Sequence, residues 1–167
     1  YVSCDYGTQN ATVFLLWNKA TDGNWYCIRE YYYSGRDKSK QKTDAEYAED
    51  LKKWLGDTKI RAMIVDPSAA SFIAELRKRK YKVLKARNDV LDGIRLVATL
   101  LTLKKLFFCN SCENTIAEFQ SYIWDEKAAD RGEDKPVKQY DHAMDAVRYF
   151  VYTILSNQLA KLKTMKG

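Results

Sequence analysis

Three stretches near the start of the chain decide the fold: VSCDY at residues 2–6, ATVFLLW at residues 11–17 and WYCIREYYY at residues 25–33. Each is rich in β-branched and aromatic residues, which favour strands. The intervening segment 18–24 is rich in residues that break regular structure, which predicts a tight turn. We therefore expect two consecutive hairpins that form a three-stranded antiparallel unit.

After the basic, polar segment 34–42, the hydrophobic period changes to that of helices. Thr43 and Glu46 have the spacing of a capping box, and Gly56 stops the helical pattern. Asp89 is placed to cap a later helix. Helices are predicted at residues 43–55, 69–80, 89–104, 113–122 and 140–161, strands at 62–65, 82–86 and 106–109, and a loop or hairpin at 125–139.

Alternating strands and helices predict parallel strand pairs, because parallel neighbours need connections of helical length. The sequence therefore predicts an α/β fold: a mixed sheet with an antiparallel three-stranded start, then parallel strands, and helices on both faces. The 167 residues suit a single domain, 1–167. Because the chain begins at Tyr1 rather than Met, we expect it to be a fragment of a longer protein.

The composition excludes several classes of protein. Hydrophobic residues make up 46% and charged residues 30%, close to globular averages, which argues against disorder. No apolar run approaches the roughly 18 residues that a membrane span needs. The net charge of +6 favours a polyanionic partner. Four cysteines are few for a secreted disulfide scaffold, so a reducing, intracellular location is expected.

Common catalytic and nucleotide-binding motifs are absent from the sequence. It contains neither a GxxxxGK[ST] loop nor a GxGxxG loop. The one histidine, His142, cannot build an HExxH zinc site, and the CxxC pair Cys109 and Cys112 lacks two further zinc ligands. Carboxylates therefore remain as the candidates for chemistry.

Three aspartates have unusual positions. Asp5 belongs to an otherwise apolar or small strand, where a carboxylate is costly to bury unless it is paired or bound to a metal. Asp66 follows a strand at its carboxyl end, the edge at which ligands bind in open α/β sheets. Asp145 borders the apolar stripe of the last helix, on the same side as His142 and Tyr149.

Each of these residues also has a purely structural interpretation. Asp66 before Pro67 has the pattern of a helix N-cap. Asp5 suits a solvated cap of the following turn. Asp145 suits a solvent-exposed residue that pairs with Arg148 or Tyr149. His142 on its own is typical of a structural histidine. The joint placement of the carboxylates on the first strand, the fourth strand and the last helix favours a functional site.

Four stretches occur in an order and spacing that suggest one family: CDYG at 4–7, IVDPS at 64–68, NDVLDGI at 88–94 and DHAMDAVRY at 141–149. They resemble the C-terminal nuclease domain of tailed-phage terminase large subunits. The resemblance implies an RNase H-like fold, Mg or Mn ions on Asp5, Asp66 and Asp145, and endonucleolytic cutting of viral DNA concatemers during packaging.

Two ions about 3.5–4 Å apart suit phosphodiester hydrolysis, and hard cations prefer oxygen ligands. In this scheme Asp5 bridges both ions, Asp66 and Asp145 each hold one side, and His142 orients a ligand or moves a proton. Lys135 and Lys138 are the predicted DNA-binding residues, because a hairpin there would overhang the carboxylates. The basic segment 36–42 is the second choice.

By the same resemblance, the partners are double-stranded DNA, an upstream ATPase motor domain that is not in this chain, the terminase small subunit and the portal protein. The expected location is the cytoplasm of the infected bacterial host, with no membrane partner. Two alternatives stay open: another RNase H-like nuclease, such as a junction resolvase, and a non-catalytic module that binds DNA or the portal.

Overall fold

A computed structural model describes residues 1–7, 10–123, 136–137 and 140–156. The strands are β1 (Val2–Asp5), β2 (Ala11–Lys19), β3 (Trp25–Ser34), β4 (Met63–Val65), β5 (Val83–Lys85) and β6 (Leu106–Phe108). The helices are α1 (Asp44–Leu55), α2 (Ala70–Lys78), α3 (Val90–Thr102), α4 (Glu113–Ser121) and α6 (His142–Phe150), and a π-helical turn (Val151–Leu155) follows α6.

The strands form one mixed sheet in the order β5-β4-β1-β2-β3-β6. The pairs β1–β2 and β2–β3 are antiparallel. The pairs β1–β4, β4–β5 and β3–β6 are parallel. The predicted antiparallel start followed by parallel strands is therefore confirmed, and β1 lies inside the sheet.

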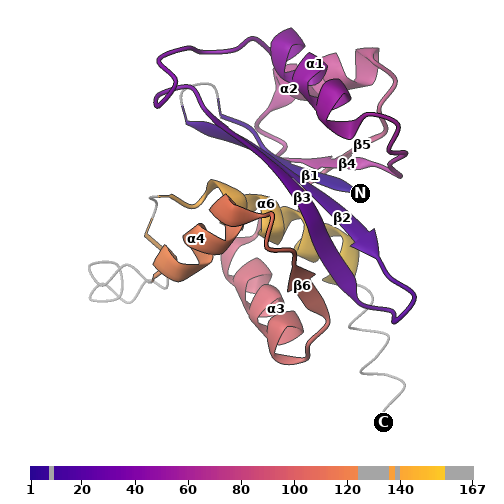
Figure 1. Cartoon of the computed structure of the whole chain (residues 1–167), viewed down its shortest axis with the longest axis vertical. Helices are drawn as coiled ribbons and strands as arrows, with labels where there is room; N and C mark the ends of the chain where they lie inside the picture. Colours follow the sequence, from indigo (N-terminus) through magenta and orange to yellow (C-terminus); the bar gives the residue numbers. More distant parts are fainter. Residues whose placement is uncertain (8–9, 124–135, 138–139, 157–167) are drawn as a thin grey trace.

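Helices cover both faces of this sheet, as predicted (Figure 1). Helices α1 and α2 pack on one face, where Tyr47, Leu51 and Phe72 are fully buried. Helices α3, α4 and α6 cover the other face. The capping box of α1 is present, because the Thr43 and Glu46 side chains each accept a backbone N–H from the other residue.

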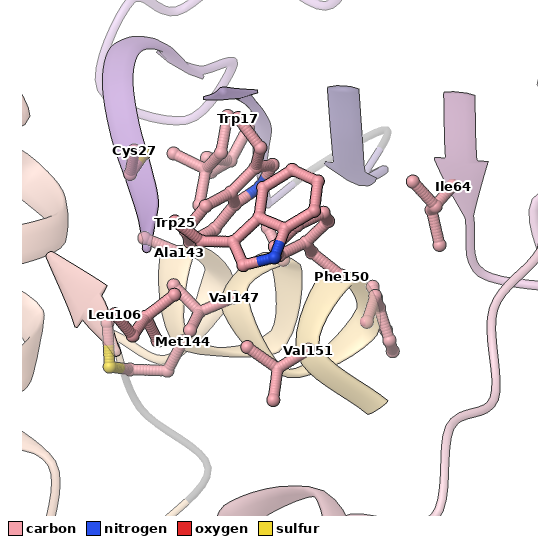
Figure 2. Packing of buried hydrophobic residues seen from close by; sticks show 14 of the residues in the cluster. Trp17, Trp25, Cys27, Ile64, Leu106, Ala143, Met144, Val147, Phe150 and Val151 are labelled. Atoms are coloured by element: carbon pink, nitrogen blue, oxygen red, sulfur yellow. The ribbon is translucent and has the colours of Figure 1, made fainter. Parts of the chain in front are cut away.

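Helix α6 is held closely against the sheet by small and aromatic residues (Figure 2). Ala143 and Ala146 are fully buried, which lets the helix backbone approach the strands. Phe150 stacks on Trp17 with ring centroids 4.3 Å apart and meets Trp25 edge-on at 5.1 Å. Such aromatic pairs add roughly 0.5–1.5 kcal/mol each beyond their burial. The helix that carries Asp145 is therefore firmly anchored.

The observed helices are shorter than the sequence patterns predict. Lys80, Lys104 and Tyr140 have positive φ angles of 67°, 52° and 52°, a left-handed conformation that does not continue an α-helix. The α-helical part of the last helix ends at Phe150 rather than continuing without change toward 161, because the backbone widens into the π-helical turn. Residues beyond 156 lie outside the described part of the chain.

Two local expectations can also be compared with the structure. Asp89 occupies the N-cap position of α3, but its side chain makes no capping hydrogen bond. The predicted loop or hairpin at 125–139 lies almost wholly outside the described residues. Within the described ranges, none of the helices has the length and apolar character that a bilayer crossing requires.

Candidate active site

The register of two parallel strands brings Asp5 and Asp66 to the same edge of the sheet. Cys4 of β1 pairs with Val65 of β4, so the next residues of both strands are neighbours. Cys4 and Val65 face α1 and α2. Because side chains alternate along a strand, Asp5 and Asp66 point to the opposite face, which α6 covers. This is the carboxyl end of both strands.

Helix α6 places His142 directly on Asp5. The two side chains are 2.9 Å apart, from Nδ1 of His142 to Oδ2 of Asp5, and only 14% of the Asp5 side chain is exposed. Burial raises the pKa of Asp5 to about 6; nearby Asp145 adds to this rise, and His142 opposes it. The hydrogen bond to Asp5 raises the pKa of His142. A solvated turn cap is therefore the wrong interpretation of Asp5.

Asp145 forms a buried ion pair one helical turn further along α6. Its Oδ1 lies 2.7 Å from Nη2 of Arg148, whose side chain is 4% exposed. The other terminal nitrogen of Arg148 donates to the carbonyl of Asn88 at 2.7 Å. The predicted pairing of Asp145 with Arg148 is therefore present, but inside the protein instead of at its surface. It fixes the position of the Asp145 carboxylate.

Asp66 does not cap a helix. Its carboxylate accepts the backbone N–H of Ser68 at 2.7 Å, within the turn before α2, and the N-cap position of α2 is Ala69. Burial would raise the pKa of Asp66, but polar contacts from Ser68, Tyr149 and Asn88 lower it by more. Asp66 is therefore a carboxylate with a favoured charged form.

Tyr149 is a buried phenol on α6 with acidic surroundings. Its pKa is raised, mainly by burial, and then by the charges of Asp5, Asp145 and Asp66. One phenol on α6 therefore lies within electrostatic reach of all three side chains. That these distant aspartates form one site stays a prediction, with which the contacts among β1, β4 and α6 are compatible.

The donor chemistry of this site fits hard divalent cations, which prefer carboxylate oxygens. The carboxylates nevertheless have protein partners: His142 for Asp5, Arg148 for Asp145, and Ser68 for Asp66. Across the part of the chain that the structure describes, no three His, Cys, Asp or Glu side chains are arranged as a metal site. Metal binding would therefore require these side chains to adjust.

A hollow of about 490 Å³ opens over this edge of the sheet. Asp5, His142 and Asp145 line it, together with Gly7 after β1, Ser34 at the end of β3 and Arg36 after β3. Asp66 is not among its lining residues. Lys135 and Lys138, the predicted DNA-binding residues, lie outside the described residues. The structure therefore brings Arg36, from the second-choice segment, to the site.

Glu118 is the main site-supporting residue that the sequence analysis missed. It reaches from α4 to the first turn of α6, where its Oε2 accepts the backbone N–H groups of Ala143 at 2.7 Å and Met144 at 3.1 Å. Tyr32 donates to its Oε1 at 2.9 Å. Asp141, the N-cap residue, makes no side-chain cap. Glu118 therefore supplies the cap of the helix that carries His142 and Asp145.

The order of the strands and the helices on both faces of the sheet (Figure 1) define an RNase H-like fold. A family model described as "Terminase RNAseH like domain" matches residues 5–152. The chain belongs to this family.

Three relatives illustrate the similarity. The large terminase subunit of Escherichia phage T5 is 27% identical over 154 residues, which cover 90% of this chain and 34% of that protein. The large terminase of a thermophilic bacteriophage, solved in complex with ADP, is 60% identical with a TM-score of 0.91 over 93% of this chain and 39% of that one. The chain thus spans well under half of these two relatives.

A third relative shares the fold at low identity. The nuclease domain of the bacteriophage SPP1 large terminase, solved with bound Mn, is 19% identical with a TM-score of 0.60. The match covers 89% of this chain and 81% of that domain.

Proposed function

We propose that this domain is a divalent-metal-dependent endonuclease that hydrolyses phosphodiester bonds of double-stranded DNA. Asp5, Asp66 and Asp145 would hold two Mg or Mn ions. The observation that carries the proposal is the placement of Asp5 and Asp66 at the ends of neighbouring parallel strands, with α6 holding His142 on Asp5 and Asp145 one turn further along. The Mn in the related SPP1 nuclease domain supports the choice of ion.

When bound, such ions activate a water molecule and stabilise charge on the phosphate oxygens. The chain's own residues hold the ligands in place. Asp5 is fixed by an interior strand and by His142, which orients its carboxylate. Arg148 holds Asp145, and Tyr149 with Asn88 directs Asp66. These contacts already restrict the carboxylate side chains in the free protein. Less conformational entropy is therefore lost when a metal ion binds.

The biological setting follows from the family. We infer that the domain cuts concatemeric viral DNA during genome packaging, in the cytoplasm of the infected bacterial host. Its partners would be an ATPase motor domain of the same large subunit, the terminase small subunit and the portal protein. Similarity to large terminases, of which this chain matches a part, supports this inference.

The test is cleavage of supercoiled plasmid in Mg, Mn or EDTA. We expect nicking and linearisation only with a divalent ion. Asp5→Asn and Asp145→Asn should lower the rate about 100-fold or more, because each removes a charged ligand. The control Asp57→Asn changes an exposed aspartate after α1 and should stay within about twofold of wild type.

Circular dichroism would verify that all variants fold. Cleavage that continues in EDTA, or that survives in both folded site variants, would exclude the proposed metal mechanism. DNA binding that is insensitive to divalent ions, without any cutting, would favour the non-catalytic alternative.

A further inference from the structure

The loop that follows β3 has a defined backbone. The backbone N–H groups of Lys38 and Lys40 donate to the carbonyls of Ser34 and Gly35 at 3.1 and 3.0 Å. The Tyr33 hydroxyl donates to the carbonyl of Lys40 at 2.8 Å, which closes the loop onto its own strand. The position of residue 36 is therefore set by hydrogen bonds on both sides of it.

Arg36 lies on this loop at the rim of the carboxylate hollow. The charged side chains that line the hollow are Asp5, Asp37, Asp141, Asp145, His142 and Arg36. Among the described residues that line this hollow, only Arg36 carries a permanent positive charge. Acidic side chains repel a phosphodiester backbone, so a cation at the rim is needed to attract it.

The sheet register sets the separation between Asp5 and Tyr32, a residue of the strand that leads into the Arg36 loop. Asp5 pairs with Val13, and Val13 pairs with Tyr32, so Tyr32 is two strands away from Asp5. At about 4.8 Å per strand this is roughly 10 Å, or about three nucleotide steps of 3.4 Å along a duplex axis. Arg36 follows four residues after Tyr32, and both line the hollow that also contains Asp5 and Asp145. Arg36 is therefore suited to a phosphate near the cut, beyond the scissile one.

The basic side chains of segment 36–42 point to different parts of the protein. Lys42 is turned toward α1, where it pairs with Asp50 and lies 3.8 Å from the centroid of the Tyr33 ring. Lys40 and Arg36 line a second hollow of about 310 Å³, and the ion pair of Lys40 with Glu46 is exposed and long, at 3.9 Å. Because both hollows share Arg36, a path leads from the carboxylates past Arg36 to Lys40.

We propose that Arg36 binds a backbone phosphate of the DNA on the path that leads away from the carboxylates, with Lys40 as the next contact. This inference rests on the proposed nuclease function, whose substrate it positions. A guanidinium matches a phosphate with two parallel hydrogen bonds, which fixes the strand's position and carries no base specificity.

The experiment measures binding of a fluorescein-labelled duplex by anisotropy, in Ca²⁺ instead of Mg²⁺ or Mn²⁺, over a range of salt. For Arg36→Ala we expect about tenfold weaker binding at about 0.1 M salt and a slope of log K against log salt that is smaller by about 1. Arg36→Lys should restore the slope, because it keeps the charge. The matched control is Lys38→Ala, since Lys38 is exposed on the same loop but lines neither hollow.

Unchanged affinity and slope in Arg36→Ala, or an equal loss in Lys38→Ala, would overturn the inference. The plasmid assay separates this outcome from failure of the nuclease proposal. Metal-dependent cutting with normal binding by Arg36→Ala would exclude only the phosphate contact. Binding that depends on Arg36, without any cutting, would support the contact and exclude the nuclease.

Discussion

Arg148 shows how one residue connects the core to the site. Its side chain is 4% exposed, and its head group is held by Asp145 and by the carbonyl of Asn88. Its aliphatic part passes over α3 at Gly93. A Cβ on Gly93 would lie 2.4 Å from Cγ and 2.7 Å from Cδ of Arg148, closer than any real contact. Gly93 is therefore required by the side chain that orients Asp145.

We predict that Gly93→Ala destabilises the protein by about 1–2 kcal/mol. Overpacking typically costs about 1–3 kcal/mol, while alanine regains up to about 1 kcal/mol of helix propensity. Urea denaturation measures the change. In an Arg148→Ala background the clash is removed, so Gly93→Ala should become neutral or stabilising. An equal destabilisation in both backgrounds would contradict this explanation.

At the scale of elements, α4 supports α6 through Glu118. The Glu118 side chain caps the first turn of α6, and only 5% of the residue's surface is exposed. Burial raises the pKa of Glu118 to about 7, while hydrogen bonds from Tyr32, Met144 and Ala143 and the nearby His142 act in the opposite direction. Keeping the Glu118 cap charged inside the protein therefore lowers the free energy of unfolding, by an amount that depends on pH.

The pH dependence has a definite sign. Below pH 4.5 Glu118 is protonated in both the folded and the unfolded state. Between pH 4.5 and about 7 the unfolded state releases its proton first, so the stability falls as the pH rises. We predict that Glu118→Gln removes this decline. The difference in the free energy of unfolding between the variant and wild type should grow by on the order of 2 kcal/mol from pH 4.5 to about pH 7.

Stability curves of wild type and Glu118→Gln at several pH values provide the measurement. Comparing the two at each pH removes the titration of groups that do not interact with Glu118; the charge interaction with His142 stays in the difference. Glu113→Gln, an exposed position in the first turn of the same helix, is the control and should track wild type. A wild-type minus Glu118→Gln difference that does not vary with pH would refute the prediction.

For the whole molecule, the site joins two neighbouring strands of the sheet to the helical layer that contains α6. Asp5 and Asp66 come from β1 and β4, whereas Asp145 comes from α6, which packs against β1 and β2. Mutual repulsion among carboxylates disfavours this arrangement, and a bound cation would relieve it. Metal binding should therefore stabilise the entire domain.

We predict that Mg or Mn at about ten times its Kd raises the free energy of unfolding by about 1.4 kcal/mol, which corresponds to about 3–6 °C in Tm. Thermal denaturation with the ion and with EDTA measures this shift. Asp5→Asn should abolish most of the shift, and Asp57→Asn should keep it. An equal Tm in EDTA and in either metal would contradict ligation at this site.

The local sequence determined the elements of this protein. The hairpins of β1 to β3, the capping box of α1 and the alternation of strands and helices depend on residues close together in the chain, so periodicity and turn chemistry predict them. The positions of Asp5 and Asp66 at strand ends could be predicted for the same reason. The helical periodicity of the last helix singled out Asp145, and the family motif agreed with it.

Tertiary structure alone decided how these residues are held. The burial of the Asp145–Arg148 pair, the cap that Glu118 gives to α6 and the approach of Arg36 to the hollow join segments from different parts of the chain. No local pattern encodes such contacts, because they depend on how both helical layers pack on the sheet and on the register of its strands. Packing therefore sets the environment of carboxylates whose positions the sequence already reveals.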